Sequence, residues 1–183
     1  GCDLSVNSLL DALKSVGYRA SWEKINELVR LFQQAHLIGL LPEYSTSLAP
    51  KTTTTDKVYA VDQGMAYATS RANQQDIGKR LETAIYAELM RRTANGRMET
   101  VTSYTAPTQT REKVDFLVGD ALASDPYALF QVTVDMTAEK TCRREVGSLE
   151  IAMAKTGIKD AKIITLREAT QIETERGIIE VIP

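Results

Sequence analysis

Two segments of alternating apolar and polar residues, close together in the second half of the chain, constrain its fold most. They predict strands over about residues 112–118 and 127–135. Because successive side chains of a strand point to opposite faces, each segment offers one apolar face and one polar face. The apolar faces carry Val114, Phe116 and Val118 in the first strand and Phe130, Val132 and Val134 in the second.

The flanking segments predict an α/β fold. A helix is predicted over about residues 74–93, where apolar residues recur every four positions, and a further strand over about 98–104. Another helix begins at a Thr137 cap and ends at Gly157. Strands follow in AKIITL and GIIEVI. The predicted order is helix, three strands, helix, strand, strand, which is typical of a mixed sheet flanked by helices.

The first 58 residues predict a small domain of their own. One helix covers about residues 4–16 and ends at Gly17, and a second follows a Ser21 cap, with Trp22 in its apolar stripe. The extended LIGLLPEYSTS, a threonine-rich loop over 51–55 and the strand-like KVYAV come next. Helix, turn, helix and a two-stranded wing form the winged-helix pattern. We therefore predict a winged-helix-like domain over 1–58 and a second domain over 59–183.

Composition excludes several functions. His36 is the only histidine, so a zinc site built on two histidines is ruled out. No two of the ten glycines lie closer than ten residues, so the chain contains neither type of glycine-rich phosphate loop. With 22 basic and 24 acidic residues, no global positive field attracts nucleic acid.

Segment lengths and the two cysteines bear on the cellular setting. The longest apolar stretch, residues 37–41, is far shorter than the roughly 18 residues of a membrane helix, so no membrane association is expected. Cys2 and Cys142 form no disulfide framework, which favours the cytoplasm. Because the chain begins without methionine, we expect it to be a piece of a longer protein.

A polar cluster is predicted on the sheet. Lys113 and Asp115 share one strand face, and Gln131, Thr133 and Asp135 share the corresponding face of the next strand. Glu82 on the preceding helix can overlook them. Magnesium prefers oxygen ligands and needs convergent carboxylates, so Asp115 is the first candidate ligand and Glu82 the second.

Several segments together resemble a known family. They are KVYAVDQG, GKRLETAIYAEL, KVDFLV, FQVTVD, RREV, AKIITL and EVIP. Their order is similar to the C-terminal region of AAA-type ATPases of the archaeal-ATPase group. In that region a winged helix precedes a PD-(D/E)xK restriction-endonuclease-like domain of unknown function. The resemblance covers nearly the whole chain, and it implies a further N-terminal domain that binds ATP and magnesium.

The nuclease pattern carries over only in part. The helix acid matches Glu82 and the metal-binding aspartate matches Asp115, but the Glu-x-Lys motif falls on Gln131 and Thr133. The missing acid would be a metal ligand, and the missing lysine would stabilise phosphoryl charge. Lys113 and Asp135 are the two candidates to replace them. The resemblance therefore implies a non-catalytic module that recognises DNA or a protein partner and couples that contact to the ATPase domain.

Two alternatives remain open from the sequence. The chain is a divalent-metal-dependent nuclease with a migrated active-site residue, or it is a pure protein-interaction or oligomerisation module. If DNA binds to the first domain, the expected contacts are cations of its second helix and wing. These residues are Lys24, Arg30, Lys51 and Lys57.

Overall fold

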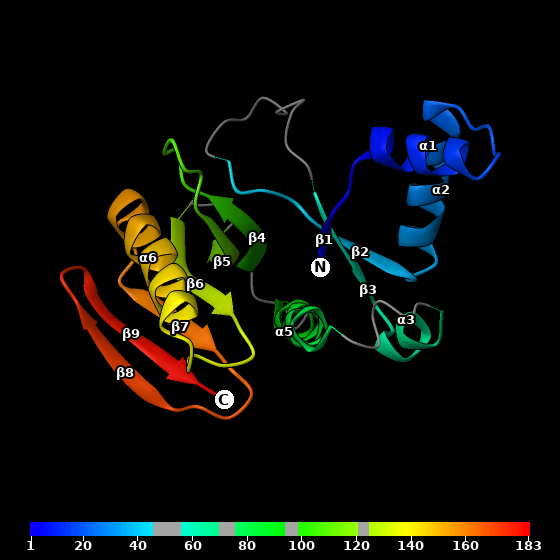
Figure 1. Cartoon of the computed structure of the whole chain (residues 1–183). Helices are drawn as coiled ribbons and strands as arrows, with labels where there is room; N and C mark the ends of the chain where they lie inside the picture. The colour runs from blue at the N-terminus through cyan, green and yellow to red at the C-terminus, as the bar shows by residue number, and fades with distance from the viewer. Residues whose placement is uncertain (46–55, 70–75, 94–98, 121–124) are drawn as a thin grey trace.

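The computed structural model describes residues 1–45, 56–69, 76–93, 99–120 and 125–183. They form a mixed α/β structure with a three-stranded sheet, a six-stranded mixed sheet and flanking helices. Figure 1 shows the two sheets on either side of one helix, α5 (Ile77–Thr93). None of the described helices is long and apolar enough to cross a membrane.

The N-terminal part consists of a small antiparallel sheet and a helical hairpin. The sheet has the order β1 (Cys2–Asp3), β3 (Lys57–Ala60), β2 (Ile38–Leu41). The hairpin joins α1 (Val6–Ser15) to α2 (Trp22–Gln34), and a short helix, α3 (Gln63–Thr69), follows the sheet. The predicted wing tip at 51–55, including Lys51, lies outside the described residues.

Local residues at the ends of these helices explain where the helices begin and end. Gly17 has a φ of 87°, in the left-handed region that glycine tolerates best. Ser21 accepts a hydrogen bond from the backbone of Lys24 at 3.2 Å, so it is the predicted cap of α2. Asp62 accepts hydrogen bonds from the amides of Gly64 and Met65 at the start of α3.

The large sheet has the order β4-β5-β6-β7-β9-β8. The antiparallel strands β4 (Glu99–Thr105), β5 (Lys113–Asp120) and β6 (Asp125–Val132) are the three predicted after α5. Helix α6 (Glu139–Thr156) then leads to β7 (Asp160–Ile164), which pairs in parallel with both β6 and β9 (Gly177–Ile182). Strand β8 (Thr170–Thr174), which was not predicted, pairs antiparallel with β9 at the edge.

Two predicted boundaries near α6 are wrong. The third strand was expected to reach residue 135, but β6 ends at Val132, and the amide of Thr133 bonds the Ile164 carbonyl before the chain turns away. Thr137 was expected to cap α6, but the cap residue is Ala138, which makes no side-chain bond. The Thr137 hydroxyl instead bonds the Asp135 carboxylate, which competes with capping. Gly157 ends α6 with a φ of 76°, as predicted.

Each face of the large sheet has its own core. On one face, α6 packs Leu149, Ala152 and Met153 against the strands. On the other face, α5 contributes Tyr86, and the small sheet contributes Leu41 and Tyr59. The small sheet therefore shares a hydrophobic core with β4, β5 and β6, although β3 straddles the predicted domain boundary after residue 58.

Candidate functional site

The site begins where β5 and β6 separate. The ladder between these strands ends at the pair Phe116 and Phe130. Beyond it, the Asp115 amide donates to Gln131 Oε1 at 3.1 Å, and the Val132 amide donates to Asp115 Oδ2 at 3.0 Å. Side chains thus replace the backbone bonds of the next pair. The structure brings Asp115 and Gln131 together at the predicted place.

A lysine from the small sheet lies between the two predicted acidic residues. The Nζ atom of Lys57 on β3 is 2.8 Å from Asp115 Oδ1 and 3.0 Å from Glu82 Oε1 on α5. The three side chains are only 13–17% exposed. Partial burial weakens solvent screening, so these ion pairs are stronger than typical surface pairs. Sequence reasoning grouped Lys57 with surface cations of a DNA-binding domain and missed this position.

The neighbouring charges and burial shift the pKa values of all three groups. Burial alone lowers the pKa of Lys57, but Asp115 and Glu82 outweigh it and raise that pKa above its ordinary value. Burial raises the pKa of Asp115, which Lys57 offsets only in part. For Glu82, burial acts upward, but Lys57 and the Tyr59 hydroxyl leave the pKa below its usual range. Lys57 therefore stays charged at neutral pH.

Tyr59 fixes Glu82 from the side of the small sheet. Its hydroxyl donates to Glu82 Oε1 at 2.8 Å, and its ring stacks on Tyr86 with centroids 4.1 Å apart and 6° between the planes. Burial, followed by the charge of Glu82, raises the pKa of the Tyr59 phenol. The phenol therefore stays protonated and acts as a donor.

A further acidic residue enters the network from α6. Glu145 is 2% exposed and accepts a hydrogen bond from Gln131 Nε2 at 2.6 Å. Its other oxygen accepts from Arg144 Nε at 3.0 Å. Glu145 was missed from the sequence, although it interrupts the apolar stripe of α6 between Cys142 and Leu149, which is a signal for a buried acid.

An open cavity of about 450 Å³ lies beside this network and is lined by Glu82, Asp115, Gln131 and Glu145, among others. Within the described residues, no three acidic, histidine or cysteine side chains gather closely enough to hold a metal ion. The buried side-chain nitrogen and oxygen atoms of those residues also all have hydrogen-bond partners. The donors and acceptors of the network thus satisfy one another.

The two residues expected to replace the missing motif lie elsewhere. Lys113 Nζ pairs with Asp3 Oδ2 at 3.0 Å, at the surface. Asp135 is exposed in the turn after β6, where it accepts a hydrogen bond from the Thr137 amide. The Thr133 hydroxyl donates to the Asp135 carbonyl. Thr133 and Asp135 do not lie on the strand with Gln131, because β6 ends at Val132.

Several exposed cations among the described residues are paired with acids on their own helix. Lys24 lies 3.0 Å from Glu27 on α2. Arg91 and Arg92 share Glu88 on α5, and both lower the pKa of that carboxyl to about 2. Arg30, the other predicted DNA contact on α2, is exposed. These pairs reduce the positive potential that the surface offers to phosphate groups.

Comparisons with family models, with curated proteins and with solved structures found no match to this chain.

Proposed function

We propose that this chain is a non-catalytic recognition module, the C-terminal region of an AAA-type ATPase, with a winged-helix part and a nuclease-like part. One observation carries the proposal: the ammonium group of Lys57 lies between the carboxylates of Glu82 and Asp115, at 3.0 and 2.8 Å. In this proposal, ATP and magnesium bind to a separate N-terminal domain, and this module transmits partner binding to that domain.

The chemistry of the site favours a structural role for the acidic pair. Metal-assisted hydrolysis needs carboxylates available to a divalent cation, and a positive group beside the scissile phosphate. Lys57 already pairs with both carboxylates. Gln131 offers only a neutral amide, whose oxygen accepts from the Asp115 amide and whose nitrogen donates to Glu145. Lys57 belongs to the small sheet, so the acidic pair fastens that sheet to α5 and β5.

A cleavage assay tests the non-catalytic role. The protein is incubated with plasmid and single-stranded DNA in the presence of Mg²⁺ or Mn²⁺, beside an Asp115→Asn variant whose folding is checked by circular dichroism. We expect no cleavage by either protein. Cleavage by the unmodified protein that the variant lacks would overturn the proposal.

Surface composition favours a protein partner over DNA. The helical hairpin exposes large apolar side chains, and one of its cations, Lys24, is paired with Glu27. Apolar and aromatic groups drive protein contacts, whereas DNA binding depends on unpaired cations that displace counterions. The exposed apolar residues of the hairpin are Leu9, Val16, Tyr18, Trp22, Leu31 and Phe32.

A gel shift at low ionic strength separates the two kinds of partner. Duplex and single-stranded DNA are titrated with the protein and with a Lys24→Glu, Arg30→Glu double variant. We expect no retardation at low salt, where electrostatic binding is strongest. Retardation by the unmodified protein that the double variant loses would assign the module to DNA.

A divalent-metal-dependent nuclease is the second candidate function, because Lys57 supplies a cation beside Asp115 and Glu145 supplies a third acid near the cavity. The two functions predict different effects of Lys57→Ala, one on DNA cleavage and the other on Mn²⁺ affinity. A catalytic Lys57 makes the variant lose cleavage, whereas a neutralising Lys57 makes it gain Mn²⁺ affinity, because its carboxylates are then unpaired. Calorimetric titration with Mn²⁺, beside Lys113→Ala as the control, measures that affinity.

A further inference from the structure

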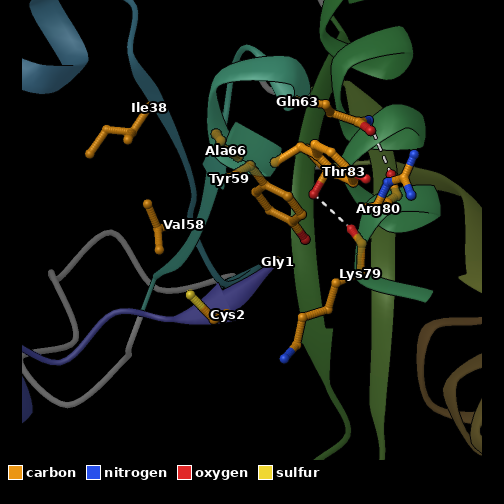
Figure 2. A pocket seen from close by; sticks show the side chains of 12 residues that line it. Gly1, Cys2, Ile38, Val58, Tyr59, Gln63, Ala66, Lys79, Arg80 and Thr83 are labelled. Atoms are coloured by element: carbon orange, nitrogen blue, oxygen red, sulfur yellow. Dashed lines mark hydrogen bonds between the residues drawn. The ribbon is translucent and has the colours of Figure 1, made fainter. Parts of the chain in front are cut away.

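A second cavity, with a volume of about 310 Å³, lies where the small sheet, α3 and α5 meet, and Tyr59 of β3 is one of the residues that line it. Figure 2 shows Ile38 and Val58 of the small sheet on one side and Arg80 and Thr83 of α5 on the other, with Tyr59 between them. This volume is near the lower end of the range found for small-molecule sites.

The walls of this cavity are largely apolar, because the polar side chains in them bond to the backbone. Gln63 Nε2 donates to the Arg80 carbonyl at 3.0 Å, and Thr83 Oγ1 donates to the Lys79 carbonyl at 2.8 Å (Figure 2). The Tyr59 hydroxyl donates to Glu82. An occupant of the cavity therefore meets mainly aliphatic and aromatic carbon.

The charged groups of the cavity all have one sign. None of the described residues that line it is acidic, whereas Lys79 and Arg80 are both cations. Lys79 Nζ makes an exposed pair with Asp76 at 3.2 Å, which is weak in water. The Arg80 guanidinium lies 5.3 Å from the centre of the Tyr67 ring, which holds it over α3.

One wall is held rigidly before any ligand arrives. Tyr59 is 1% exposed, stacks on Tyr86 and is anchored to Glu82 through its hydroxyl. A wall that is already ordered loses little entropy on binding, which favours affinity for a ligand that fits.

From these observations we propose that this cavity binds a small, mostly apolar molecule with a single anionic group, such as a medium-chain carboxylate. The apolar part lies against Ile38, Val58 and Ala66, and the anion faces Lys79 and Arg80. This site is separate from the acidic cluster and does not depend on the proposed function.

Titration with decanoate, followed by ¹H–¹⁵N NMR, tests the proposal, with decanol as the uncharged control. We expect saturable shifts in α3, β3 and the first turn of α5, with a dissociation constant of about 0.1–1 mM. Decanol should bind about fivefold more weakly, because it lacks the charge. Equal affinities for the two probes, or decanoate shifts confined to the α1–α2 hairpin, would overturn the proposal.

Two pairs of variants locate the site. Arg80→Gln should weaken decanoate binding about fivefold, whereas Arg176→Gln, in the exposed turn between β8 and β9, should leave it unchanged. Ala66→Trp places a large ring in the cavity and should abolish binding. Ala68→Trp places the same ring at an exposed position of α3, so binding should persist. If Ala66→Trp binds decanoate as tightly as the unmodified protein, the ligand does not occupy this cavity.

Discussion

Helices α2 and α6 both carry apolar residues at helical spacing, yet they differ in how much of that stripe they bury. In α2 only Ile25 is buried, while Trp22 is 55% exposed and Phe32 is 46% exposed. In α6, Leu149 and Ala152 are fully buried. The difference lies in the surface opposite each helix: α6 packs on a six-stranded sheet, whereas α2 packs on a short partner helix. The apolar pattern therefore predicts which face of a helix is available, but not whether a partner covers it.

Like α6, the small sheet buries apolar side chains against the large sheet. Leu41 and Tyr59 are buried in the same core as Phe116, whereas no residue of the hairpin belongs to either core cluster. The N-terminal region thus contains a sheet that is integrated with the rest of the chain and a hairpin that is loosely packed.

The largest expected effect comes from removing one apolar side chain from α6 and one from α2. Leu149→Ala should lower the free energy of unfolding by about 3 kcal/mol, because it leaves a cavity in a fully buried position. Phe32→Ala removes a larger side chain, yet it should cost less than about 1 kcal/mol, because that ring is half in water. Urea denaturation followed by circular dichroism measures both values. Similar losses for the two variants would contradict the comparison.

The next effect tests the link between the small sheet and the large one. Lys57→Met keeps the length of the side chain but leaves Glu82 and Asp115 without their cation, and should cost about 2 kcal/mol. Lys113→Met is the matched control, because it removes only an exposed pair with Asp3 and should cost less than about 1 kcal/mol. Denaturation midpoints of the two variants decide the question. A Lys57→Met variant as stable as Lys113→Met would show that the buried pairs contribute no stability.

The smallest expected effect tests whether the α1–α2 hairpin unfolds independently of the large sheet. Ser21→Ala removes the cap of α2 and should cost about 1 kcal/mol in that helix, which accelerates amide exchange there about fivefold. Exchange in β6 and β7 should not change. Ser15→Ala is the control, because the Ser15 hydroxyl only donates to the Ala12 carbonyl within α1. Equal acceleration in β6 would mean that the hairpin and the large sheet open as one unit.

Local sequence signals predicted α1, α2, α5, α6 and most of the strands. The cap at Ser21 and the left-handed Gly17 and Gly157 depend on chemistry within a few residues, so the sequence alone reveals them. Strand β8 was missed because its residues, TQIET, are mostly polar and exposed at a sheet edge. Trp22 lies in the predicted apolar stripe of α2, yet it is 55% exposed, because few residues of the chain pack against that stripe.

The candidate site was likewise predicted only in part from the sequence. Alternation along β5 and β6, together with the family resemblance, indicated Asp115, Gln131 and Glu82. The sequence did not reveal Lys57 or Glu145, which complete the network. Lys57 lies 58 residues from Asp115 along the chain, so its role depends on how the small sheet packs against α5 and β5. Backbone periodicity and capping are local, whereas a buried ion pair between distant segments forms only when the tertiary packing brings its charges together and excludes water.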